Sequence, residues 1–177
     1  MDIREKILEI RTTRDKSTFV DYFIDRPKEF DEMMNCIFSL EEYPYKEYAS
    51  WILIHISHSG KIDLQDYYPR LVDLLFKTED QTVLRNVARS LHQFQVTDYR
   101  ESEFVDLLIS FIQNYDNKVA LQVYAMYILA QFIKRHPELK DEITQIIALH
   151  RAKKTAAYHS AERNFLKRVA KIQVVFS

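Results

Sequence analysis

The sequence predicts an all-α protein: an α-solenoid of about four antiparallel helix pairs, preceded by one or two short N-terminal helices. Three observations support this class. Glycine occurs once and proline four times, too few for the turns that a sheet protein of 177 residues needs. Apolar residues recur at helical spacing along the chain. An alanine recurs in every second helix with a period of 36 to 39 residues, as stacked helical pairs require.

Two short amphipathic helices are expected within residues 1–26, where they cap the first pair. Isoleucines spaced three and four apart share one face of a helix over residues 2–11. Ser17 is the expected N-cap of a second helix that ends near residue 24.

Four helix pairs follow, and short connections make successive helices antiparallel neighbours. The expected pairs cover residues 28–40 with 45–58, 64–77 with 81–95, 101–113 with 118–135, and 137–150 with 155–172. Gly60 follows an apolar run and is expected just past a helix end, where glycine adopts a left-handed backbone most easily. We expect one repeat domain over residues 1–177.

The repeat register can be checked on short matching segments. Residues 72–75 and 105–108 share Val-Asp-Leu-Leu at a separation of 33. The second helices align on alanines at separations of 39, 37 and 36, namely Ala49, Ala88, Ala125 and Ala161. A small side chain there allows two helix axes to approach closely. The alternative is an irregular helical bundle in which this spacing is accidental.

The pair lengths, with segments such as Tyr68 to Leu75 followed by Val83 to Leu91, resemble the HEAT and HEAT-like repeat class from about residue 28 to the end. In the second segment a basic residue, Arg85, lies three positions before Ala88. The Phe-Val-Asp-Tyr-Phe run at 19–23 and the Trp-Ile-Leu run at 51–53 are also similar to small bacterial HEAT-like proteins of unassigned function. The resemblance implies a solenoid that exposes binding surfaces, and implies no chemistry.

Composition excludes several classes of protein. With 47% hydrophobic and 29% charged residues the chain is neither disordered nor a membrane protein. The first eleven residues lack the apolar core of a secretory signal, so we expect a cytoplasmic protein. Cys36 is the single cysteine and is expected in a core helix. One glycine cannot supply a phosphate-binding loop, and no serine lies in a Gly-x-Ser-x-Gly elbow.

No catalytic residue, cofactor or metal site is assigned from the sequence. His55 and His58 are three apart on one expected helix, a spacing that could direct both rings at a metal. A zinc site needs at least a third protein ligand, and the sequence dictates none. We therefore interpret them as ordinary histidines near a helix end.

Charge is distributed unevenly along the chain. Residues 1–149 carry 18 Lys and Arg against 25 Asp and Glu, a net of −7, whereas residues 150–177 carry seven against one, a net of +6. The basic end is expected to be a polar capping repeat; an acidic partner, self-association or nucleic acid remain alternatives. Its candidate contact residues are Arg151, Lys153, Lys154, Arg163 and Lys167.

A second basic feature lies inside the repeats. Arg85, Arg89 and His92 are spaced i, i+4 and i+7, so they share one helix face. The resemblance to HEAT-like solenoids implies that second helices line a concave groove, into which Lys46, Arg85, Arg89 and Gln122 would project. The alternative is that the arginines neutralise nearby acids such as Asp73 and Glu79. Trp51 is expected to be a partly buried packing residue.

Two functions follow from these features. The favoured one is a non-catalytic scaffold that uses a solenoid surface to bind another protein or peptide. The alternative is a nucleic-acid-binding protein of the HEAT-like DNA-repair glycosylase type. That function needs a basic concave surface with aromatic residues and a central carboxylate, and the acidic first 149 residues count against it. Binding to DNA as a function of salt discriminates between the two.

Overall fold

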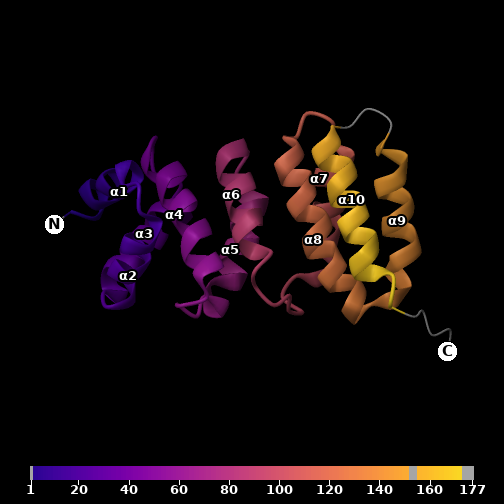
Figure 1. The fold of residues 1–177 in the computed structure, drawn as a ribbon, viewed down its shortest axis with the longest axis horizontal. Coiled ribbons are helices and arrows are strands. Elements are labelled where there is room, and N and C mark those ends of the chain that lie inside the picture. Colours follow the sequence, from indigo (N-terminus) through magenta and orange to yellow (C-terminus); the bar gives the residue numbers. More distant parts are fainter. Residues whose placement is uncertain (1, 152–154, 173–177) are drawn as a thin grey trace. The chain divides into compact units, whose positions relative to one another are not determined.

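The computed structural model describes residues 2–151 and 155–172, and in this part of the chain all regular structure is helical (Figure 1). The elements are α1 (Ile3–Thr12), α2 (Lys16–Ile24), α3 (Pro27–Phe38), α4 (Tyr45–Ser59), η1 (Gln65–Tyr67), α5 (Tyr68–Lys77), α6 (Gln81–Leu91), α7 (Glu101–Gln113), α8 (Val119–Arg135), η2 (Pro137–Leu139), α9 (Lys140–Leu149) and α10 (Ala156–Val169). The all-α prediction is confirmed. The expected helices at 64–77 and 137–150 each begin with a short 3-10 turn, η1 and η2.

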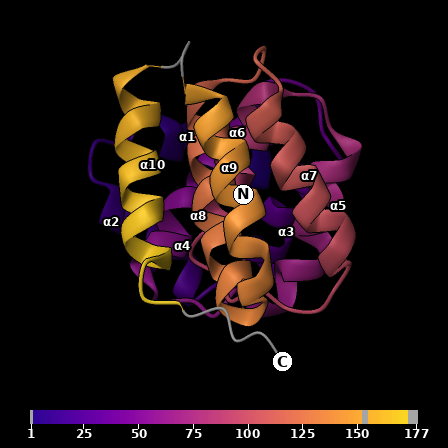
Figure 2. The same ribbon diagram turned by 90° about the vertical axis from the view of Figure 1, so that its right-hand side faces the viewer.

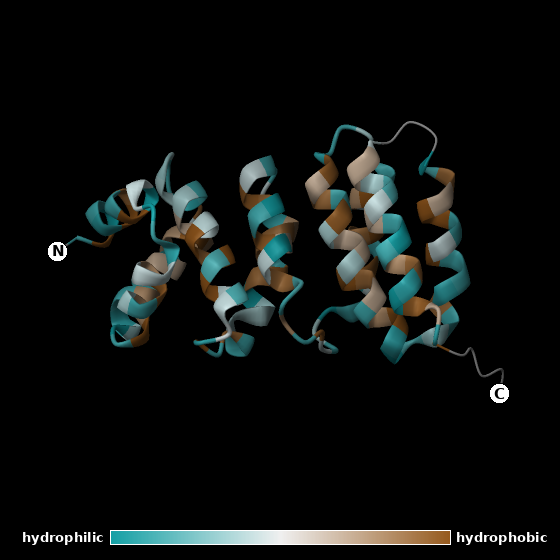
Figure 3. Ribbon diagram, in the orientation of Figure 1, coloured by the Kyte–Doolittle hydropathy of each residue, from teal (hydrophilic) through white to brown (hydrophobic). Residues whose placement is uncertain are grey.

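The chain divides into two compact units, residues 1–94 and 95–177. Unit 1 contains α1 to α6 and unit 2 contains α7 to α10. Each unit buries the apolar stripes of its own helices, which carry hydrophobic and hydrophilic residues on different faces (Figure 3). A single repeat domain over the whole length stays a prediction.

Helix ends follow local capping chemistry. The Asp80 carboxylate accepts hydrogen bonds from the backbone N–H groups of Thr82 (2.8 Å) and Val83 (3.1 Å), which would otherwise lack partners at the start of α6. Gly60 ends α4 with φ of +64°, as predicted. The prediction for Ser17 is wrong: Asp15 is the N-cap of α2, and its carboxylate accepts from the Ser17 backbone at 2.9 Å.

Two other turns place residues with side chains in the left-handed region. Leu40, after α3, has φ of +52°, and Arg100, before α7, has φ of +48°. Such backbone angles bring the Cβ atom close to the following carbonyl oxygen, which strains any residue except glycine. Both turns therefore carry backbone strain that glycine would avoid.

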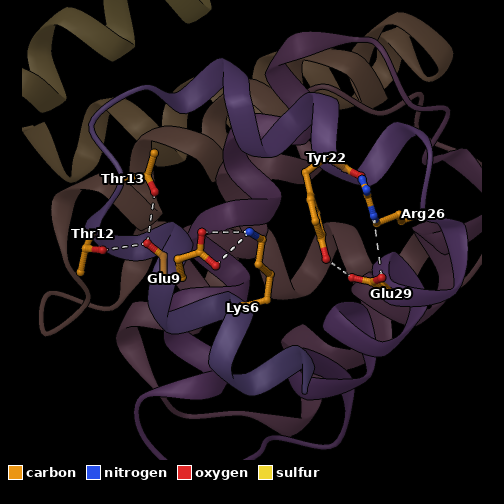
Figure 4. Close-up of polar contacts among 7 residues, drawn as sticks. All are labelled: Lys6, Glu9, Thr12, Thr13, Tyr22, Arg26 and Glu29. Atoms are coloured by element: carbon orange, nitrogen blue, oxygen red, sulfur yellow. Dashed lines mark hydrogen bonds and ion pairs between the residues drawn. The ribbon is translucent and has the colours of Figure 1, made fainter. Parts of the chain in front are cut away.

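In unit 1, α1 and α2 pack against α3 and α4. α1 buries its three isoleucines. Figure 4 shows polar contacts at the surface, within α1 between Lys6 and Glu9, and from Tyr22 of α2 to Glu29 of α3. The Tyr22 ring lies between two cations, with Lys6 Nζ 4.4 Å and Arg26 Cζ 4.3 Å from its centroid. The Tyr22 hydroxyl donates to Glu29 at the start of α3, as Figure 4 shows. α1 and α2 are thus attached to the first repeat.

The α4–α6 contact of unit 1 has a polar centre. The Asn86 side-chain amide donates to the Ser50 hydroxyl at 3.0 Å, and the Ser90 hydroxyl donates to the Asn86 carbonyl at 3.0 Å. All three side chains are buried, and the aligned alanines of these helices, Ala49 and Ala88, are fully buried beside them. Buried polar groups are tolerated here because they bond to one another.

In unit 2, α8 packs against both α7 and α10, and Figure 2 shows α8, α9 and α10 beside one another. Phe104 and Phe132 meet edge to face at the centre of the α7–α8 pair, 5.8 Å apart and fully buried. Ala125 and Ala161 are buried on α8 and α10. All four aligned alanines are therefore interior, as their proposed packing role requires.

Candidate functional site

Trp51 lies at the centre of a surface that four helices of unit 1 build together. It stands on α4, partly buried as predicted, with its ring 5.9 Å from the buried ring of Phe19 on α2. His55, one turn later on α4, packs edge to face against it with centroids 4.5 Å apart. The indole thus packs against two other rings, those of Phe19 and His55.

Two cations lie over this indole. Arg11 at the end of α1 places its Cζ 4.7 Å from the Trp51 centroid and 5.4 Å from that of Tyr48. Lys16 at the start of α2 places its Nζ 5.7 Å from the Trp51 centroid. Cation–π attraction holds both groups near the ring. Neither forms an ion pair with any residue that the structure describes.

α6 adds two arginines beside the same α4 surface. Arg85 and Arg89 are one helical turn apart, and α6 packs directly on α4. Arg85 donates to the Asn86 side-chain oxygen at 3.3 Å and forms no ion pair within residues 2–151 and 155–172. We call the surface formed by Arg11, Lys16, Trp51, His55, Arg85 and Arg89 the α4–α6 face.

His55 is neutral within this cationic surface. Burial, together with the nearby charges of Lys16 and Arg89 and the neighbouring His58, lowers the pKa of its imidazole from the ordinary 6.5 to about 4. Its Nε2 atom is buried and has no hydrogen-bond partner among the described residues. The face therefore presents fixed arginine and lysine charges around an uncharged aromatic pair.

The other sequence candidates of unit 1 lie at the edges of this face. Lys46 is engaged in ion pairs with Glu47 and Asp80, both at 3.6 Å. His92 ends α6, where its Nδ1 lies 2.9 Å from the side-chain nitrogen of Gln93. Arg85 forms no ion pair with Asp73 or Glu79. The alternative role predicted for Arg85, to neutralise these two acids, is therefore wrong.

The expectation that Gln122 projects into a groove is wrong. Its side chain is fully buried in unit 2, and its amide donates to the Asn114 carbonyl at 2.9 Å in the turn between α7 and α8. A glutamine in this position stabilises the turn by satisfying a carbonyl that the end of α7 leaves without a helical partner. Gln122 is therefore structural.

The basic C-terminal candidates have different environments. Arg151 binds Glu162 with two guanidinium nitrogens at 2.5 to 3.0 Å, and this pair raises the pKa of the Arg151 guanidinium. Arg163 and Lys167 are exposed on α10 and form no ion pair with a described residue. Lys153 and Lys154 lie outside the described residues.

Two residues singled out in the sequence, Cys36 and His58, have contacts typical of structural side chains. Cys36 is buried in α3, as predicted, and burial raises the pKa of its thiol to about 11, so the thiolate nucleophile is scarce at neutral pH. The Nδ1 atom of His58 lies 2.7 Å from the Ile54 carbonyl oxygen. Across residues 2–151 and 155–172, no cluster of three His, Cys, Asp or Glu side chains has the arrangement of a metal site.

Sequence reasoning missed Arg11 and Lys16. Both stand in short helices of mixed charge, with no motif to distinguish them from other surface cations. Their place beside Trp51 follows only from the packing of α1 and α2 on α4.

None of the described helices combines the length and apolar character needed to span a bilayer.

Comparison with known proteins supports the architecture. The family model described as "HEAT repeat domain" matches residues 3–169, nearly the whole described chain. No curated protein and no solved structure matches the chain. Because the family model covers α1 to α10, the chain belongs to the HEAT repeat family.

Proposed function

We propose that the protein is a non-catalytic scaffold and that its α4–α6 face binds an acidic segment of a protein partner. HEAT repeats generally mediate protein interactions, which favours binding over catalysis. The observation that carries the proposal is a half-buried tryptophan with two cations over its ring, Arg11 and Lys16, neither of which forms an ion pair with a described residue.

The chemistry of this face suits carboxylates. A guanidinium group donates in a fixed fork that matches a carboxylate, and such charge-assisted hydrogen bonds are roughly twice as strong as neutral ones. Contact with Trp51 restrains Arg11 and Lys16 before binding, so less side-chain entropy is lost when a ligand arrives. Tryptophan and arginine are also the residues that contribute most to protein interfaces.

The test uses defined peptides, because the partner is not identified. A fluorescein-labelled peptide of 20 glutamates is titrated with the protein, and anisotropy gives its affinity while Trp51 emission reports contact with the face. Reversing both cations in Arg11→Glu/Lys16→Glu should weaken binding at least about tenfold, or about 1.4 kcal/mol. Binding should also weaken as salt rises.

A matched control separates this face from general charge. Lys28 on α3 and Lys77 on α5 are exposed, are not part of the α4–α6 face and form no ion pair with a described residue, so the double variant Lys28→Glu/Lys77→Glu makes the same change in net charge. It should retain affinity within about threefold, since screened surface charges contribute little. Equal losses in the two double variants would contradict the proposal.

The nucleic-acid alternative is tested in parallel with a labelled 20-nucleotide single-stranded DNA. Nucleic-acid binding would give a steep fall in affinity with salt, because each neutralised phosphate releases counterions. DNA binding that is stronger than peptide binding and lost in Arg11→Glu/Lys16→Glu would replace the scaffold proposal by the nucleic-acid one.

A further inference from the structure

Unit 2 contains a groove that is distinct from the α4–α6 face of unit 1. It runs between α8 and α10 as an open hollow of about 380 Å³. Apolar and small side chains line it, chiefly Val119, Val123, Tyr124 and Tyr127 of α8 with Ala157 and Ser160 of α10. All of these side chains retain solvent exposure.

Small residues create this hollow. Ala157 and Ser160 lie on the exposed side of α10, near the buried Ala161. Larger side chains at these two positions would fill the space between the helices. The tyrosines of α8 form one wall, with their ring centroids 6.3 Å apart and nearly perpendicular. A single apolar or aromatic side chain of a ligand fits a hollow of this kind better than a whole helix does.

One end of the groove is polar and cationic. The Asn164 side-chain nitrogen lies 3.4 Å from the Tyr127 hydroxyl. One helical turn further along α10, Arg168 places its Cζ 4.2 Å from the Tyr127 centroid. Arg168 forms no ion pair with any residue in the described ranges, so its charge remains available at the mouth of an apolar groove.

We propose that this groove is a second binding site, for a short peptide segment of a protein partner that carries an apolar or aromatic residue followed by an acidic one. The apolar side chain lies between α8 and α10, where its burial contributes about 25 cal/mol for each Å² removed from water. The acidic side chain accepts from the Arg168 guanidinium. Charge complementarity selects an acidic peptide over a basic one.

The composition of the groove disfavours nucleic acid. A nucleic-acid site follows a phosphate backbone with several cations, whereas none of the described residues that line this groove is Lys or Arg. Arg163 also lies on α10 but does not line the groove, and it provides a matched control on the same helix.

The experiment is a selection of random 12-residue peptides displayed on phage against the full chain, followed by anisotropy measurements with the enriched peptides. The enriched sequences should combine an aromatic or aliphatic residue with Asp or Glu. Ser160→Leu fills the groove and Arg168→Glu reverses its charge, and each should weaken binding at least about tenfold. Ala156→Leu and Arg163→Glu make the same changes outside the groove and should stay within about twofold.

Circular dichroism at increasing temperature first shows that all four variants are folded. The proposal is overturned if no peptide is enriched, if the enriched peptides lack acidic residues, or if binding survives both Ser160→Leu and Arg168→Glu. Equal weakening by the two control variants would also overturn it. The Arg11→Glu/Lys16→Glu variant should bind these peptides normally, so the groove and the α4–α6 face can fail independently.

Discussion

The two units place alanines at matching positions of their second helices and surround them with different chemistry. In unit 1 the α4–α6 contact has a buried polar centre, in which Asn86 bonds to Ser50. In unit 2, Ala125 of α8 and Ala161 of α10 are buried, and the buried polar side chains of these two helices, Gln122 and Glu162, bond to a turn carbonyl and to Arg151. The same repeat therefore tolerates different buried polar neighbours, provided that buried donors and acceptors find partners and that the aligned residue stays small.

The exposed surfaces of the two units also differ in chemistry. The α4–α6 face of unit 1 surrounds one tryptophan with cations, whereas unit 2 has a groove between tyrosines and small residues with Arg168 at one end. The repeat geometry determines which positions are buried, and the side chains that remain outside determine what each unit can bind. Family membership alone therefore identifies the architecture and leaves the ligand to be found.

The largest expected effect concerns the separate cores of the two units. Phe132→Ala should destabilise unit 2 by about 3–5 kcal/mol, because it removes a fully buried ring and leaves a cavity beside Phe104. Urea unfolding followed by far-UV circular dichroism measures the loss. Trp51 lies in unit 1, so its fluorescence transition should move less. If both transitions shift together by the same amount, the units unfold as one body.

An intermediate effect is expected from the polar contact that distinguishes unit 1. Asn86→Ala should cost about 1–3 kcal/mol, because it removes the donor to Ser50 inside a buried interface. A double-mutant cycle with Ser50→Ala isolates the pairwise energy, which should be about 0.5 kcal/mol or more. Strictly additive losses would show that the 3.0 Å contact contributes nothing of its own.

The smallest expected effect is a pH dependence that belongs to unit 1. Folded His55 has a pKa of about 4, below its ordinary 6.5, so the unfolded chain binds this proton first as the pH falls. The stability contributed by neutral His55 is complete above pH 6.5 and is lost as the pH falls towards 4.

Between pH 7 and pH 5 this loss should be about 1 kcal/mol, allowing for partial solvent exposure of the ring. His55→Phe removes the titrating group while it keeps an aromatic ring beside Trp51. Urea unfolding at the two pH values should therefore show a smaller fall in stability for the variant. If the wild type and the variant lose the same free energy of unfolding between the two pH values, the pH dependence does not come from His55.

Local pattern was sufficient to predict the helices and the buried alanines, because both depend on periodicity along one helix. It was not sufficient for Gln122, whose buried amide bonds to a carbonyl eight residues earlier in a turn. A polar side chain in a second helix has the same sequence signature whether it faces solvent or a turn. Arg11 and Lys16 were missed for a related reason, since their position over Trp51 requires three helices to pack first.

The turns at Leu40 and Arg100 have a consequence for how this molecule can change. A side chain in left-handed backbone costs roughly 1–2 kcal/mol, and glycine avoids most of that cost. The interior of the chain is already filled, with Met33, Met34 and Ile37 fully enclosed, so most substitutions there do harm. During adaptation to heat, substitutions to glycine in these two turns would therefore be the least disruptive stabilising changes, and they would leave the two proposed binding surfaces unaltered.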